Sequence, residues 1–148
     1  MSPVPKARRF TPPPPASLAA ALQGLFADAG YAWLVNRIDS GHNGGGCLLV
    51  AQALKAILPG SHVVTMVNAG DREPGMPEHY GVRWQDWYFD GNGGFPSVIA
   101  WINHFDSKNP GTIVTVIDRF KRFNRISNYS GHRRELIAFL KNKLSAKP

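Results

Sequence analysis

The sequence predicts an α+β fold in which helices pack on a small antiparallel β-sheet. Three observations favour this class. Apolar residues recur at helical spacing near both ends of the chain and in its middle. Runs of β-branched and aromatic residues lie between these segments, and two of the runs are separated only by a tight turn. Helices that are mixed with strands able to pair as a hairpin are typical of an α+β domain.

Length and composition indicate one globular domain. The chain has 148 residues, which is enough for a single substantial core, and 43% of them are hydrophobic. No stretch approaches the roughly 20 apolar residues that span a bilayer, and the alanine-rich start follows four prolines rather than forming an export signal. We therefore expect a soluble protein with no membrane partner. The single cysteine excludes an internal disulfide framework and favours the cytoplasm, including the host cytoplasm if the protein is a delivered effector.

The charge is unevenly distributed. Seventeen Lys and Arg against ten Asp and Glu give a formal net charge of +7, and the basic residues are concentrated near the N-terminus and beyond residue 118. A basic C-terminal face could bind nucleic acid, although a solvated helix face is the commoner meaning of such a pattern. Residues 1–15 are basic and rich in proline, so we expect a flexible tail there and a single domain over 16–148.

The first half of the chain predicts two helices. Leucines at helical spacing favour a helix over 16–29, with Ser17 as its cap. We expect residues 31–38 to form a short strand or an irregular core segment, and the glycine-rich residues 39–46 to form a loop. A second, buried helix covers 47–60 and ends at a Pro-Gly pair.

The second half predicts a hairpin among further helices and strands. The segment "HYGVRWQDWYFDG" is typical of two strands joined by a tight turn at Gln85 and Asp86. The other regular segments are a strand at 61–69, a helix at 95–105, a strand at 111–118 and a closing amphipathic helix at 130–144.

Cys47 begins the buried helix directly after three glycines. The positive end of a helix dipole favours the thiolate form of a cysteine, which is the nucleophilic form. Gly45 and Gly46 would let a substrate carbonyl approach the backbone amide of Cys47. The ordinary alternative is a core thiol, because free cysteines are usually buried.

The hairpin supplies a base and an acid for such a thiol. With the turn at Gln85 and Asp86, Gly81 faces Asp90 across the two strands, and His79 shares the face of Gly81. His79 and Asp90 therefore lie diagonally and can meet, and the small Gly81 leaves room for a substrate or for the cysteine helix. Asp86 is most simply a turn residue, and a longer loop would be needed to bring it to His79.

The chain order of these residues resembles papain-like fold cysteine hydrolases of the small bacterial or phage type. The matching pieces are "GGGCLLVAQAL", "EHYGVRW" and "DWYFDGNGG", and the resemblance covers roughly residues 36–95. It implies a papain-like fold, with the cysteine helix packed on a small antiparallel sheet and flanked by other helices. It also implies Cys47 as nucleophile, His79 as general base and Asp90 as the group that orients the imidazole.

One position departs from that family. Many papain-like peptidases carry a glutamine about six residues before the nucleophile, where this chain has Gly41. Asn43 is the expected oxyanion donor in its place, together with the Cys47 amide, while His42 and Asn36 are other donors. The departure leaves a peptidase, a deamidase, an acyltransferase and an inactive relative as alternatives.

The residues together predict a cysteine hydrolase that cleaves a peptide, isopeptide or side-chain amide bond in a protein or peptide substrate. The expected cleft includes Gly45, Gly46, Gly81 and Trp84. No cofactor is expected, and the remaining histidines show no metal-ligand spacing. The alternative is a non-catalytic protein of the same fold that binds a protein partner or nucleic acid through its basic C-terminal helix. In a third interpretation Cys47 is a buried helix residue of an unrelated α+β domain.

Overall fold

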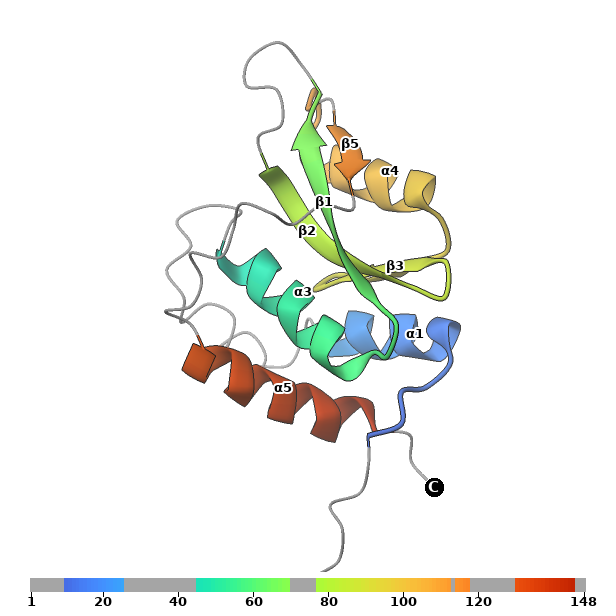
Figure 1. Cartoon of the computed structure of the whole chain (residues 1–148). Coiled ribbons are helices and arrows are strands. Elements are labelled where there is room, and N and C mark those ends of the chain that lie inside the picture. The colour runs from blue at the N-terminus through green and yellow to red at the C-terminus, as the bar shows by residue number, and fades with distance from the viewer. Residues whose placement is uncertain (1–9, 26–44, 70–76, 113, 118–129, 146–148) are drawn as a thin grey trace, which may run out of the picture.

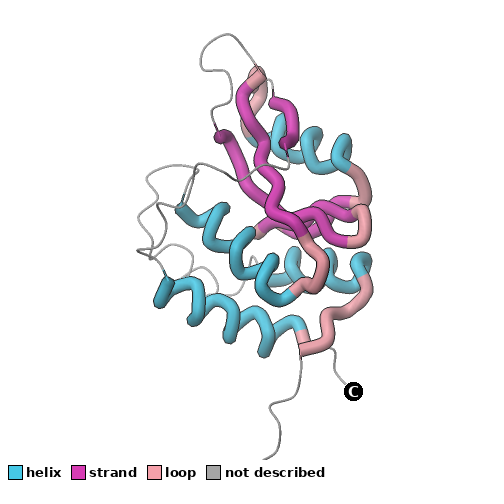
Figure 2. The backbone as a smooth tube through the Cα atoms, viewed as in Figure 1, coloured by secondary structure: helices cyan, strands magenta, loops and turns pink. Residues whose placement is uncertain are grey.

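The computed structural model describes residues 10–25, 45–69, 77–112, 114–117 and 130–145 (Figure 1). Within these ranges the chain forms four helices and a five-stranded antiparallel sheet with the strand order β4-β3-β2-β1-β5 (Figure 2). The α+β class expected from the sequence is therefore confirmed. The elements are α1 (Pro15–Leu25), α3 (Gly45–Ile57), β1 (His62–Asn68), β2 (Pro77–Trp84), β3 (Trp87–Asp90), β4 (Gly93–Phe95), α4 (Val98–Lys108), β5 (Val114–Ile117) and α5 (Ser130–Leu144).

Helices cover both faces of the sheet. The α1, α3 and α5 helices pack on one face and α4 packs on the other, as Figure 1 shows. Strand alternation explains the two layers, because Tyr80, Val82 and Trp84 point towards α3 whereas Val64 and Met66 point towards α4. None of the helices in the described ranges combines the length and the hydropathy needed to cross a bilayer.

The β2–β3 hairpin has the register that its sequence predicts. Trp84 pairs with Trp87, and Arg83 pairs with Tyr88. Gln85 and Asp86 both have positive φ, at 50° and 64°, as a type I′ turn requires. This turn matches the right-handed twist of the two strands, so it holds the register that places His79 relative to Asp90.

The β4 strand was not expected, because the sequence predicts a helix from residue 95 and the two glycines before it are not typical of a strand. The helix begins only at Val98. A Cβ atom at Gly94 would lie 2.5 Å from the Ala19 side chain and 2.6 Å from Cε1 of Phe89. Glycine is therefore needed where α1 packs directly against the edge of the sheet. The close approach of a helix explains this glycine better than loop formation does.

The N-terminal boundary differs from the expected one. The α1 helix begins at Pro15, a residue type that favours the first helical position, so Ser17 lies inside the helix and does not cap it. Phe10 packs against the core, and residues 10–15 thus belong to the fold instead of to a tail. Residues 1–9 and the segment expected as a strand at 31–38 lie outside the described residues.

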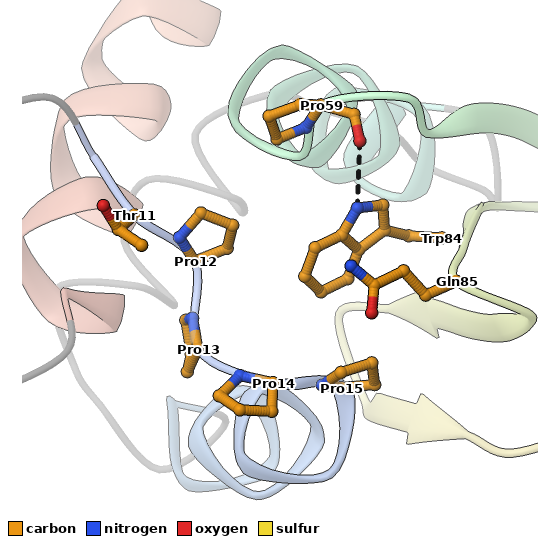
Figure 3. A pocket seen from close by; sticks show the side chains of 8 residues that line it. All are labelled: Thr11, Pro12, Pro13, Pro14, Pro15, Pro59, Trp84 and Gln85. Carbon is orange, nitrogen blue, oxygen red and sulfur yellow. Dashed lines mark hydrogen bonds between the residues drawn. The ribbon is translucent and has the colours of Figure 1, made fainter.

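Trp84 belongs to the core and to a separate hollow, not to a cleft beside His79. Its side chain is buried on the α3 face, and its indole N–H donates to the Pro59 carbonyl oxygen at 3.0 Å. The hollow beside it has a volume of about 440 Å³ (Figure 3). The expectation that Trp84 forms part of the cleft is wrong because Trp84 ends β2 and contacts Pro59 after α3, whereas His79 lies near the start of β2 and contacts the first turn of α3. The lining residues of the hollow are Thr11, Pro12, Pro13, Pro14, Pro15, Pro59, Trp84 and Gln85.

Gly81 makes room for a protein side chain instead of a substrate. A Cβ atom at this position would lie 2.7 Å from the Phe89 carbonyl oxygen and 2.7 Å from Cζ2 of Trp101. The Trp101 indole, from α4, therefore fills the space that the sequence suggested was open to a substrate or to the cysteine helix. The indole N–H of Trp101, a buried donor, therefore lies at the end of β3.

We predict that Gly81→Ala destabilises the fold by about 1–3 kcal/mol, because neither the strand carbonyl nor the enclosed indole can yield without strain. Gly24→Ala is the matched control: no atom lies within 4 Å of its added Cβ, and alanine favours the helix by about 0.5–1 kcal/mol. Chemical denaturation of both variants measures the difference. Equal stability of the two variants would contradict the close packing of Trp101 on Gly81.

Candidate active site

Cys47 lies in the first turn of α3, at the third residue of the helix. The helix is anchored by a buried apolar face, while Cys47 itself is only partly buried. The first four N–H groups of a helix have no partner within that helix, and the backbone N–H of Cys47 is one of these. The thiol thus sits at the positive end of the helix dipole, next to a backbone donor. The buried residues of α3 are Leu48, Leu49, Val50, Ala51, Ala53, Leu54 and Ile57.

His79 of β2 joins Cys47 to Asp90. Its Nδ1 lies 3.1 Å from the Cys47 Sγ, and its Nε2 lies 2.7 Å from Oδ2 of Asp90. The imidazole side chain is 12% exposed, so it is largely shielded but still reaches the surface. The structure therefore brings together the three residues that the sequence singled out, in the order thiol, imidazole, carboxylate.

Asp90 ends β3 and is almost fully buried, with 2% of its surface exposed. Its Oδ2 accepts hydrogen bonds from His79 and from the Trp101 indole N–H at 2.9 Å. Its Oδ1 accepts the Asn92 backbone N–H at 2.8 Å. Both carboxylate oxygens are thus satisfied, which a buried charge requires.

Two aromatic rings of α4 enclose the imidazole on the side of the sheet opposite α3. The Phe105 ring is stacked with His79 at a centroid distance of 5.7 Å, and the Trp101 ring is tilted at 5.8 Å. Aromatic faces attract a cation, so these rings favour an imidazolium at this position. They also exclude water from the hydrogen bond between His79 and Asp90.

The electrostatics of the site favour a protonated His79. Burial alone lowers the pKa of His79, but the hydrogen bonds to Asp90 and Cys47 and the attraction of both groups outweigh it and raise the pKa to about 10. Burial raises the pKa of Asp90, yet the His79 hydrogen bond and charge, followed by the Trp101 and Asn92 donors, lower it below 3.8. The pair of Asp90 and His79 is therefore ionic across the neutral range.

The same shifts give the sign of the pH effect on stability. The contribution of His79 is fully present below its unfolded pKa of 6.5 and is lost as pH rises through about 10. The contribution of Asp90 is present above its unfolded pKa of 3.8 and is lost as pH falls through its lowered folded pKa. The ion pair thus stabilises the fold between these limits.

Tyr80 follows His79 on β2 and points into the α3 layer. Burial, and then the charge of Cys47, raise the pKa of Tyr80 to about 12. The phenol therefore stays neutral throughout the range in which the site is ionised. It lies close enough to Cys47 to respond to the charge of the thiol.

Other residues expected at the site have different outcomes. Gly45 and Gly46 form the start of α3, directly before Cys47. Asn43, the expected oxyanion donor, lies outside the described residues, so its role stays a prediction. Asp86 is exposed in the hairpin turn, and the carboxylate that contacts His79 is that of Asp90. Within the described ranges, no group of three or more His, Cys, Asp or Glu residues is arranged to hold a metal ion.

The sequence did not identify the α4 residues of the site. Trp101 and Phe105 are four residues apart, so helical spacing places them on one face of α4. This spacing is visible in the sequence. Nothing local indicates that this face meets the α4 side of the hairpin at His79 and Asp90. The sequence also did not identify the Asn92 backbone N–H as a donor to Asp90, because this contact depends on the turn that leads into β4.

We predict that Asp90→Asn lowers the pKa of His79 below about 10, because a neutral amide no longer attracts the imidazolium. Nuclear magnetic resonance titration of the His79 ring measures this value. Asp86→Asn removes a carboxylate from the same hairpin at an exposed position whose positive φ asparagine tolerates. An equal shift in both variants would show that the His79 pKa reports general charge and not the contact with Asp90.

The three side chains form an arrangement that can activate a thiol. Asp90 orients the imidazole through Nε2, and Nδ1 is left to exchange a proton with Cys47. The thiol lies at a helix N-terminus where backbone N–H groups can stabilise a developing negative charge. Comparisons of the chain with protein-family models, with curated proteins and with solved structures found no match.

Proposed function

We propose that the protein is a papain-like cysteine hydrolase that cleaves an amide bond through a thioester intermediate. The observation that carries this proposal is the position of His79, which is hydrogen-bonded to the Cys47 thiol on one nitrogen and to a buried carboxylate on the other. An arrangement of this kind is what nucleophilic catalysis by cysteine needs: a thiol, a base and a group that orients the base.

The first chemical step is acylation of Cys47. The proton of the thiol resides on His79, and the Sγ lone pair attacks the substrate carbonyl carbon to form a C–S bond. The carbonyl electron pair moves to oxygen, and its return breaks the C–N bond. His79 donates the proton to the departing amine or ammonia, so the acyl group remains on sulfur as a thioester.

The second step is hydrolysis of that thioester. Neutral His79 takes a proton from water, and the resulting hydroxide attacks the acyl carbon. Collapse of the tetrahedral intermediate breaks the C–S bond and releases a carboxylic acid. The sulfur leaves as thiolate beside the imidazolium, which restores the starting ion pair.

The oxyanion that forms in both steps needs donors close to Cys47. The backbone N–H of Cys47 is the first of these, because it lies in the first turn of α3 without a partner inside the helix. Asn43 is proposed as the second donor. A peptide, an isopeptide and a side-chain amide all present the same carbonyl to these donors, so the proposed substrate is a protein or peptide.

The architecture supports a papain-like type. A helix carries the thiol at its N-terminus and packs on an antiparallel sheet, and two adjacent strands of that sheet carry the base and the acid. A core thiol would be fully buried, whereas Cys47 is partly exposed and contacts a titratable side chain. These features favour catalysis over the interpretation in which Cys47 only fills the core.

We predict that iodoacetamide alkylates Cys47 faster at neutral pH in the wild-type protein than in His79→Ala, as a pH–rate profile of both would show. The physical reason is that an imidazolium beside the sulfur favours the thiolate. In His79→Ala the advantage should be lost, while His62→Ala, at an exposed residue of β1, should leave the profile unchanged. A wild-type profile identical to that of His79→Ala would refute the proposed function.

We also predict that incubation with a peptide library gives products that disappear in Cys47→Ala. New amino termini detected by mass spectrometry would indicate a peptidase, and released ammonia with a mass gain of about 1 Da would indicate a deamidase. Turnover should persist to about pH 10 and fall above it, since His79 must be protonated to donate to the leaving amine. Equal binding of partners by wild-type protein and Cys47→Ala, without any product, would instead favour a binding protein.

A further inference from the structure

We infer that Trp101 is a positioning residue of the proposed hydrolase: its indole N–H holds the Asp90 carboxylate against His79 and thereby keeps the Cys47–His79 pair in its reactive form. The inference rests on the proposed function of Cys47. It concerns a residue of α4, a helix that contributes no group to the thiol, the base or the acid.

The carboxylate is held at both ends by neutral donors. Trp101 Nε1–H donates to Oδ2 at 2.9 Å, and the Asn92 backbone N–H donates to Oδ1 at 2.8 Å. With both oxygens held, the carboxylate cannot rotate about its Cβ–Cγ bond without losing a hydrogen bond in a buried setting. The Oδ2 atom therefore stays 2.7 Å from His79 Nε2.

Indole is suited to this task because of its chemistry. The Trp101 N–H donates only, and its bond to Oδ2 helps to lower the pKa of Asp90. An ionised carboxylate only accepts, so its partner His79 Nε2 must donate. His79 consequently carries a proton on Nε2, and its Nδ1 is the nitrogen that faces Cys47. Trp101 thus favours, through Asp90, the proton on Nε2 of His79, so that Nδ1 is the nitrogen that exchanges a proton with Cys47.

Packing around the indole prevents its N–H from turning away. Trp101 has no exposed surface, and its ring edge occupies the place of a Gly81 side chain. Tyr88 contacts its ring on the same face of the sheet at a centroid distance of 5.6 Å. Because a rotamer change would collide with these neighbours, the donor direction is set by the fold.

The charged neighbours of His79 make the effect measurable as a pH profile. The groups that alter its charge state are Cys47 from α3 and Asp90 from β3. β1 places the neutral Met66 opposite His79, and α4 presents two uncharged rings. On its own strand, His79 is flanked by Glu78, which accepts from Asn68 Nδ2, and by Tyr80.

The test is Trp101→Phe, which keeps an aromatic ring and removes the N–H. We expect the rate of Cys47 alkylation at neutral pH to fall roughly three- to tenfold. Trp84→Phe is the matched control, since Trp84 is also a buried indole whose N–H makes one hydrogen bond, here to Pro59. It should lose comparable stability and keep the wild-type profile.

The outcomes separate the inference from the function on which it rests. A wild-type alkylation profile identical to that of His79→Ala would overturn the proposed function itself. A wild-type thiol that reacts faster than that of His79→Ala, with a profile that Trp101→Phe leaves unchanged, would overturn only the role of Trp101. The same change in Trp101→Phe and Trp84→Phe would also overturn it, because loss of stability would then explain the profile.

A measurement on the wild-type protein covers the case in which Trp101→Phe does not fold. The indole N–H resonance of Trp101 should titrate with the same midpoint as the His79 ring, at about pH 10, because its acceptor Asp90 responds to the charge of His79. The N–H resonance of Trp84 should not move through this range, since its acceptor is a backbone carbonyl. A Trp101 resonance that is insensitive to the titration would refute the coupling.

Discussion

The burial of one carboxylate organises this fold around His79. A charged Asp90 with 2% exposure would be strongly unfavourable in an apolar setting unless each oxygen were paired. The hydrogen bonds that satisfy it come from three places: β2 through His79, α4 through Trp101, and the turn into β4 through Asn92. Removing the Asn92 donor would take away the hydrogen bond to Oδ1, and removing His79 or Trp101 would leave Oδ2 with one donor instead of two. The carboxylate therefore ties together elements on its side of the sheet, and the imidazole is held as a consequence.

The two helical layers have different relations to the site. The α3 layer presents the thiol at a helix N-terminus, and its buried leucines fix where that terminus lies. The α4 layer presents the rings of Trp101 and Phe105, which enclose the imidazole from the opposite face. His79 can meet both layers because it lies near the start of β2, where the helix terminus reaches the strand. The proposed chemistry thus depends on the position of the α3 N-terminus along β2.

The sequence predicted the parts of the site that depend on local geometry. The tight turn at Gln85 and Asp86 fixes the hairpin register, and register with strand alternation is enough to place His79 near Asp90. The sequence did not predict β4, the N-terminal boundary of the fold or the side chain that occupies the space at Gly81. Each of these depends on a helix that packs from elsewhere in the chain, and a glycine in a loop and a glycine under a helix look alike in a sequence.

The chemical type of the donors around Asp90 matters as much as their number. The molecule is strongly basic, with a net charge of +7, yet the groups that lower the pKa of Asp90 against the effect of burial are His79, an indole N–H and a backbone N–H. A lysine or arginine beside Asp90 would compete for its charge and weaken its attraction for the imidazolium. Neutral donors satisfy the oxygens and leave the charge to act on His79. The imidazolium is then retained until about pH 10, and the sulfur at the other ring nitrogen is kept beside a cation throughout the neutral range.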